Sequence, residues 1–179
     1  MCGAIKVQRD WRSGKQWSDR FLPEIKSILG QHLIAEPPIE EDAERNTDLM
    51  VLRLDAVRIG CRIRRHEYLA PYGHQFTIRA GVPSGAKTEI TKVIEGWGNY
   101  FFYGFSDEAE QALKQWVLCD LNVFRLSHAR MLAACKPGEA PGDIRTNSDG
   151  TKLTAFNLSD FPTDLVVAQS RRPIFARSA

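Results

Sequence analysis

Apolar residues recur at helical spacing near the start of the chain. Between residues 18 and 34 they fall three or four positions apart, which predicts a helix with one apolar face: Phe21, Leu22, Ile25, Ile28, Leu29 and Leu33. Ser18 or Asp19 can cap this helix, and Pro23 is tolerated because it falls in the first turn. Glu24 then lies at the edge of the apolar face.

Alternating apolar and polar positions predict strands in the middle of the chain. The runs 49–54 and 57–64 predict a hairpin joined at Asp55-Ala56, although no glycine marks that turn. Within the second run, alternation places three apolar residues on one side (Ile59, Cys61, Ile63) and four others opposite, namely Arg58, Gly60, Arg62 and Arg64. Further strands are predicted over 75–80, 99–105 and 116–121.

Helical spacing returns twice in the second half of the chain, over 88–97 and 121–135. Residues 106–115 carry a short helical pattern in a polar stretch. Loops are predicted over 35–46, 81–87 and 136–150, and one closing strand follows Gly150. This order of elements predicts a single domain over residues 1–179, of the α+β or α/β class, with a mixed central sheet flanked by helices.

Composition narrows the class of protein. Hydrophobic residues make up 43% of the chain and charged residues 26%, as in ordinary globular proteins. No apolar run is long enough for a membrane span, and residues 1–15 lack the apolar centre of a signal peptide, so we expect a cytoplasmic protein that does not contact membranes. The four cysteines show no C-x-x-C spacing, which argues against a zinc site.

Charge is distributed unevenly along the chain. Residues 36–48 hold six acidic residues and one arginine, whereas residues 53–92 hold eight basic residues and three acidic ones. Three arginines of one strand face cannot be buried without partners, because an unpaired buried charge is very costly. Arg58, Arg62 and Arg64 must therefore meet nucleic-acid phosphates, the acidic stretch 36–48, or water.

Three carboxylates are candidates for holding a divalent metal. Metal-assisted phosphodiester cleavage needs two or three carboxylates from separate elements and a cation beside the phosphate. Asp48 at a strand start, Glu24 on the first helix and Glu89 on a later helix have suitable positions. Each also has a purely structural interpretation: Asp48 as a turn residue, and the two glutamates as first-turn acids stabilised by the helix dipole.

The loop over residues 81–88 has the residue types of a phosphate cradle, with glycines, a lysine and a hydroxyl before a helix. It does not match the nucleotide-binding G-x-x-x-x-G-K-[ST] pattern, because Ala86 separates Gly85 from Lys87. Hydrolysis of ATP or GTP is therefore not expected. Nearby, Lys92 can simply pair with Glu89 at i, i+3 spacing. The cations that we expect to contact nucleic acid are Arg58, Arg62, Arg65, Lys87 and Lys92.

The order of Glu24, Asp48 in TDLMVL, and RIGCRIRR resembles the core of the PD-(D/E)XK, or restriction-endonuclease-like, nuclease superfamily. The resemblance covers about residues 18–125, leaves 136–179 as a C-terminal extension, and implies a sandwich fold and Mg²⁺ or Mn²⁺ held by Asp48. Arg62-Ile63-Arg64 stands where an acid-any-lysine triplet should be. Arginine neither binds a metal nor acts as a general base, so the missing acid is assigned to Glu89, as in members whose active-site acid has migrated.

Two functions follow, from different classes. The first is a metal-dependent nuclease that acts on DNA rather than RNA, with Asp48 and Glu89 as metal ligands, Glu24 assisting and Arg64 in the catalytic centre. The second is a non-catalytic protein on the same scaffold that grips nucleic acid or an acidic protein. A phage inhibitor of host defence is one example, since the chain also resembles uncharacterised phage-encoded proteins. A third interpretation is an assembly protein whose charged blocks pair between subunits, and a homodimer is a further expectation.

Overall fold

The computed structural model describes residues 11–35, 50–51 and 57–170. They form an α+β protein in which two main sheets are flanked by helices, as expected from the sequence, and β1 and β2 form a separate two-stranded sheet. The larger sheet has the strand order β3-β5-β6-β9, with the bounds Ile59–Arg64, Tyr100–Ser106, Leu113–Asp120 and Val166–Gln169. The smaller sheet has the order β4-β8-β7, with the bounds Gln75–Gly81, Lys152–Asn157 and Asp143–Thr146.

Strand β3 pairs in parallel with β5, which places Arg62 level with Tyr103. Residues 49 and 52–56 of the predicted hairpin over 49–54 and 57–64 lie outside the described residues, and no β2–β3 pair occurs among the described ones. The short strand β2 (Met50–Val51) pairs instead with β1 (Ile34–Ala35). A parallel partner requires a crossover of a dozen or more residues, and the segment between β3 and β5 supplies it. The predicted alternation along β3 holds, because Ile63 is buried in the core beside Phe102 while Arg62 lines a pocket on the other face.

Strand β4 lies within that crossover but joins the other sheet, where it pairs with β8. The residues set apart by sequence as a C-terminal extension supply strands to both sheets: β7 falls inside the predicted loop 136–150, and β9 pairs with β6. No helix forms over 106–115; a turn there leads directly into β6. The C-terminal segment is thus part of the fold up to Ser170.

The main helices are α1 (Trp11–Asp19), α2 (Leu22–Leu33), α5 (Glu89–Ile94) and α6 (Leu121–Ala134). Between β3 and β4 lie the short helices η1 (His66–Tyr68) and α4 (Leu69–Tyr72). Two more short helices, η2 (Leu158–Asp160) and η3 (Thr163–Leu165), join β8 to β9. The predicted helices over 18–34, 88–97 and 121–135 correspond to α2, α5 and α6. None of the described helices is long and apolar enough to cross a membrane.

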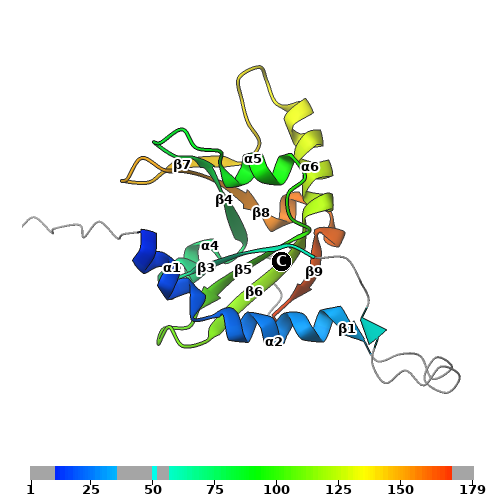
Figure 1. The fold of residues 1–179 in the computed structure, drawn as a ribbon. Coiled ribbons are helices and arrows are strands. Elements are labelled where there is room, and N and C mark those ends of the chain that lie inside the picture. The colour runs from blue at the N-terminus through cyan, green and yellow to red at the C-terminus, as the bar shows by residue number, and fades with distance from the viewer. Residues whose placement is uncertain (1–10, 36–49, 52–56, 171–179) are drawn as a thin grey trace, which may run out of the picture.

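Two apolar clusters hold the layers together. Helix α2 lies along one face of the larger sheet, while the smaller sheet, α5 and α6 lie on the other side (Figure 1). The cluster beneath α2 contains Phe21, Ile25, Ile63, Phe102 and Leu118. The larger cluster fills the space between the two sheets and α6, with its aromatic centre formed by Phe76, Phe101, Phe124, Phe156 and Phe161.

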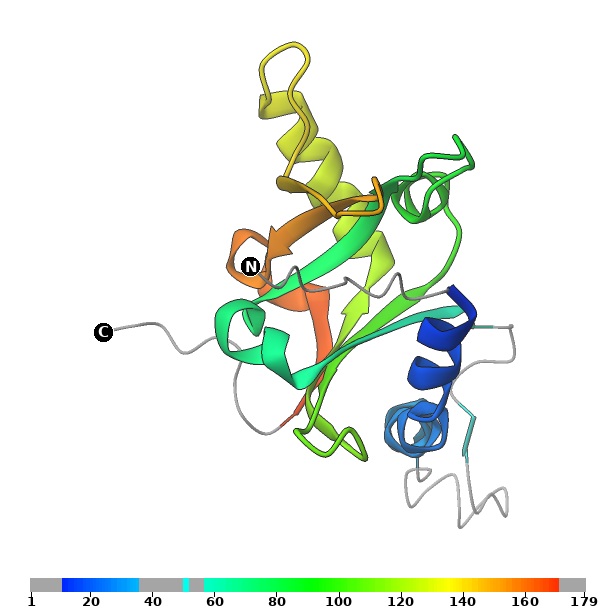
Figure 2. The same ribbon diagram turned by 90° about the vertical axis from the view of Figure 1, so that its left-hand side faces the viewer.

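Consecutive aromatic residues of β5 divide between these clusters, as strand alternation requires: Phe102 faces α2, and Phe101 and Tyr103 face the smaller sheet. The Tyr103 and Thr77 hydroxyl groups lie 3.2 Å apart and link the two sheets. The last turns of α6 project beyond this body (Figure 2).

Candidate phosphate-binding site

Arg62 lies at the centre of the site, on the face of β3 that points towards β4 and α5. Its side chain is only 16% exposed, and its guanidinium lies 2.5 Å from the Glu89 carboxylate. Burial lowers the pKa of Arg62, while the charge of Glu89 opposes that shift. A largely buried guanidinium in this position needs an anion beside it, since desolvation penalises the charged form.

Glu89 begins helix α5 and ties three elements together. Its Oε2 accepts a hydrogen bond from the backbone N–H of Arg79 on β4, at 2.9 Å, as well as from Arg62 on β3. Thr88 precedes it as the cap of α5, and its hydroxyl accepts a hydrogen bond from the backbone N–H of Thr91. The first turn of α5 is thereby anchored to both sheets.

A pocket of about 500 Å³ opens between β3, β4 and α5. Among the described residues, its charged lining consists of four cations and one carboxylate, namely Arg62, Arg79, Lys87, Lys92 and Glu89. The remainder is mainly apolar and includes Ile78, Val93, Trp97, Phe101 and Leu121. A concave site with an apolar wall and an excess of positive charge suits an organic anion.

A second pocket, of about 710 Å³, lies between α1, β3 and the β7–β8 turn. Arg62 and Arg79 line both pockets. Lys15 and Arg64 add positive charge to the second pocket, and Asp19 and Asp149 add negative charge. Its remaining lining residues are Gly14, Trp17, Ser18, Cys61, Ile63 and Thr151. Arg62 and Arg79 thus lie at the boundary between the two pockets.

The structure does not bring Glu24 and Glu89 together. The Glu24 carboxylate accepts a hydrogen bond from the backbone N–H of Leu113 at 2.9 Å, so it anchors α2 to the start of β6. Helix α2 covers the face of the larger sheet opposite to the one that carries Glu89. The expected convergence of these two glutamates is therefore wrong, and Asp48 lies outside the described residues. Within those residues there is no group of three or more His, Cys, Asp or Glu side chains able to hold a metal ion.

The other predicted cations have separate surroundings. The Arg64 guanidinium lies over the Tyr68 ring, 4.3 Å from its centroid. Arg58 is exposed, and its backbone N–H donates to the Asn99 side chain. Lys87 pairs with Glu95. Lys92 is exposed on α5 and lines the first pocket, while its expected partner Glu89 is engaged by Arg62.

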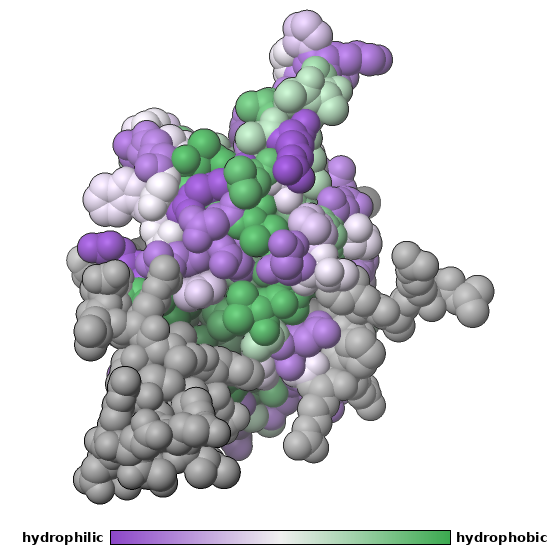
Figure 3. All heavy atoms as spheres, turned by 90° about the vertical axis from the view of Figure 1, so that its right-hand side faces the viewer, coloured by the Kyte–Doolittle hydropathy of each residue, from purple (hydrophilic) through white to green (hydrophobic). Residues whose placement is uncertain are grey.

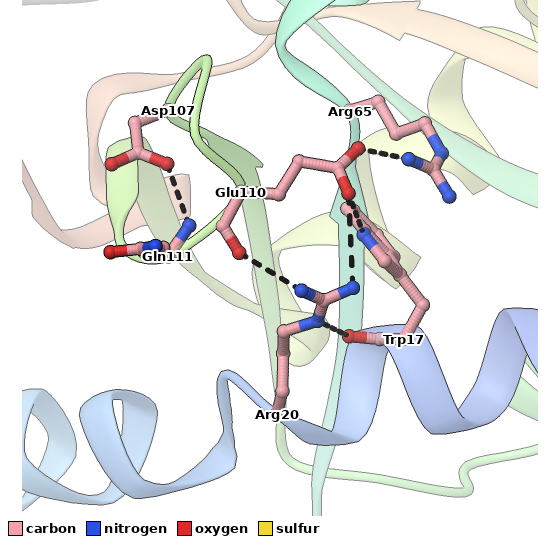
Figure 4. A network of polar contacts seen from close by, with 6 residues as sticks. All are labelled: Trp17, Arg20, Arg65, Asp107, Glu110 and Gln111. Carbon is pink, nitrogen blue, oxygen red and sulfur yellow. Dashed lines mark hydrogen bonds and ion pairs between the residues drawn. The ribbon is translucent and has the colours of Figure 1, made fainter.

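Arg65 belongs to a network around Glu110 rather than to either pocket. The Glu110 carboxylate pairs with Arg65 and accepts a hydrogen bond from Trp17 Nε1 at 2.6 Å. Arg20 donates to the Glu110 backbone carbonyl at 3.3 Å and lies 3.7 Å from its carboxylate (Figure 4). The hydrogen bond from Trp17 and the two arginines lower the pKa of Glu110. This network fastens α1 to the β5–β6 turn.

Sequence reasoning missed two residues of the first pocket. Arg79 falls in a predicted strand among buried neighbours, and its Nε is buried with no hydrogen-bond partner among the described residues. Trp97 falls at the end of the predicted helix over 88–97, but it lies beyond α5 and is 65% exposed at the pocket. The Gly-Trp-Gly sequence over 96–98 was the available signal, since glycines on both sides favour a turn.

The surface beside α6 mixes polar and apolar patches, with apolar residues exposed among hydrophilic ones (Figure 3).

Comparison of the chain with protein-family models, curated proteins and solved structures found no match. The geometry of the two pockets is therefore the basis for inferring a function.

Proposed function

We propose that this protein binds nucleic acid, with backbone phosphates held at Arg62 and Arg79. The observation that carries the proposal is that these two arginines, from different sheets, line both pockets, while Glu89 is the single carboxylate among the described residues that line the first pocket. Lys87 and Lys92 extend the positive lining. Guanidinium groups suit phosphate because their planar donors match its oxygens in pairs.

The unequal hydrogen bonding of the two arginines supports an anionic ligand. Glu89 accepts from Arg62, but it meets Arg79 through the backbone N–H alone. The buried Nε of Arg79 has no partner within the described residues, and a buried donor without an acceptor costs free energy. A phosphate beside the part of Arg79 that lines the pockets would bring negative charge that balances their positive lining.

Salt-dependent binding of labelled DNA and RNA, measured in EDTA, tests the proposal. Arg79→Gln and Lys92→Gln each remove one pocket cation, and Arg130→Gln removes an exposed cation of α6 that lies outside both pockets. We expect the first two variants to weaken binding and to reduce the slope of log K against log salt by about one unit each. Binding equal to that of the wild type and of Arg130→Gln would overturn the assignment.

A metal-dependent nuclease is the second candidate, and it is favoured by the position of Glu89 among four cations in one pocket. The described residues alone do not form its metal site, so Asp48 would have to supply a further carboxylate. Cleavage of plasmid, linear and single-stranded DNA and of RNA, with Mg²⁺, Mn²⁺ or EDTA and an Asp48→Ala control, decides between the candidates. Metal-dependent cleavage that Asp48→Ala abolishes would establish the nuclease.

Several finer expectations belong to this proposal. DNA is the expected ligand in preference to RNA, and the cytoplasm is the expected location. An acidic protein bound at the same cations, as for an inhibitor of host defence, predicts competition between that protein and DNA. A homodimer predicts a doubled mass in sedimentation at micromolar concentration.

A further inference from the structure

The exposed indole of Trp97 is held in place by its backbone. Gly96 and Gly98 on either side adopt φ values of 97° and 83°, in the left-handed region that favours glycine. These two residues turn the chain sharply between α5 and β5 and place Trp97 on the surface. A large aromatic side chain that is 65% exposed at a pocket is a common feature of ligand sites, whereas scattered exposed leucines need no explanation.

Arg125 of α6 holds this turn in place through hydrogen bonds. Its guanidinium donates to three backbone carbonyls of the turn and the end of α5: Val93 at 2.6 Å, Trp97 at 3.0 Å and Gly98 at 2.7 Å. A charged donor shared among three carbonyls removes much of the freedom of the turn. The indole is therefore positioned in advance, so that a ligand stacking on it need not order the loop as well.

The first pocket has an apolar part and a cationic part. Val93, Phe101 and Leu121 form the apolar part with Trp97, and Arg62 and Arg79 form the part that is shared with the second pocket. Gly60 also lines this pocket, and a Cβ atom at that position would lie 3.2 Å from the Phe101 ring. A volume of about 500 Å³ falls in the range of small-molecule sites. An aromatic group joined to an anion matches this division.

Resting on the proposed function, we propose that the first pocket holds one unstacked nucleotide of a single strand. Its base stacks on Trp97, its phosphate lies at Arg62 and Arg79, and the strand continues into the second pocket. In an intact duplex the faces of interior bases are covered by their neighbours, so an indole cannot reach them without flipping a base out. Aromatic platforms beside a basic groove are a general means of binding single strands.

Fluorescence anisotropy with a labelled twelve-nucleotide dT strand, and with a duplex of the same length, tests this assignment in EDTA. Stacking contributes about 1–3 kcal/mol per base in alanine substitutions, so Trp97→Ala should weaken single-strand binding by about tenfold. Duplex binding should change little. Trp97→Phe should keep most of the affinity, since a phenyl ring can still stack. Ile94→Ala is the matched control, because Ile94 is an exposed apolar residue at the end of α5, three positions before Trp97, that does not line the pocket.

A second variant tests the positioning role of Arg125. Arg125→Ala should weaken single-strand binding, and combining it with Trp97→Ala should add little further loss, because both changes remove the same stacking contact. A loss in Arg125→Ala that adds fully to that of Trp97→Ala contradicts the positioning role. Circular dichroism and a thermal melt of each variant separate a loss of binding from a loss of fold.

The outcomes separate this inference from the proposed function. If the wild type binds neither strand nor duplex, both fail. If it binds nucleic acid through Arg79 and Lys92 but Trp97→Ala behaves like Ile94→Ala, or if the duplex binds more tightly than the strand, the single-strand inference is overturned and the proposed function stands. Competition by dTMP at a concentration as low as that of the dT strand would identify a mononucleotide site instead and would also overturn the strand assignment.

Discussion

The guanidinium of Arg62 and the carboxylate of Glu89 face each other at 2.5 Å, joining the larger sheet to helix α5. Sequence reasoning assigned these residues to two separate partners, phosphate for the arginine and a metal ion for the glutamate. In the structure each is the nearest charged partner of the other. A phosphate that enters the pocket must therefore share Arg62 with Glu89.

Replacing Glu89 with glutamine should separate binding from catalysis. Glu89→Gln leaves Arg62 without its neutralising partner, so we expect the free energy of unfolding to fall by about 1–3 kcal/mol, because the pair is only partly buried. Affinity for DNA should rise, since one negative charge leaves a positive pocket. Urea denaturation and salt-dependent DNA binding measure these effects, and Glu95→Gln, which frees Lys87 instead, is a charge-matched comparison. Weaker binding by Glu89→Gln would contradict this account of the pocket.

Glu24 should prove structural rather than catalytic. Glu24→Ala removes the acceptor for the Leu113 backbone N–H and should lower the free energy of unfolding by about 1–2 kcal/mol. DNA binding, and any metal-dependent cleavage, should be unchanged per folded molecule. Chemical denaturation and activity assays at a temperature well below the midpoint provide the measurement. If Glu24→Ala had normal stability but no activity, Glu24 would have a catalytic role and not a structural one.

Acidification should weaken the attachment of α1 through Glu110. The pKa of Glu110 is lowered in the folded state, chiefly by the hydrogen bond from Trp17 and also by Arg65 and Arg20. Its contribution to stability is therefore present above its ordinary pKa of 4.5 and is lost as the pH falls through the lowered value.

Comparison of wild type and Glu110→Gln by urea denaturation between pH 7 and pH 3 measures this contribution. The difference between the two proteins should shrink only below about pH 4.5. His128, whose pKa is lowered by burial, lowers the stability of both proteins equally. This loss begins before that of Glu110, as the pH falls below about 6.5. A constant difference across the whole range would rule out titration of Glu110 as the cause.

The thiol of Cys119 should be unreactive until the protein unfolds. Burial raises its pKa to about 12, so at pH 8 only about one molecule in ten thousand carries the thiolate. Peptide-resolved alkylation with iodoacetamide should label the exposed Cys61 in the folded protein and Cys119 only in denaturant. Equal labelling rates for both residues in native buffer would show that β6 opens without global unfolding.

The pattern of apolar residues was sufficient to predict most of the elements. Helices α2, α5 and α6 and strands β3 to β6 were expected at close to their observed bounds, because each carries a helical or alternating period over several turns or pairs. Strand β7 was missed because its exposed residues, such as Ile144, show no alternation against a core. Strand β9 is short and pairs over only a few residues with β6, so its local pattern is equally weak.

The sequence by itself determined the class of the fold, the alternation that separates Ile63 from Arg62, and the excess of cations between residues 53 and 92. The tertiary structure alone decided which residues meet. Strand pairing depends on long-range packing and not on adjacency in the sequence, so β3 pairs with β5, and β4 belongs to the smaller sheet. These two pairings place Arg79 beside Arg62 and Glu89 against both strands, whereas Glu24 lies on the opposite side of the larger sheet.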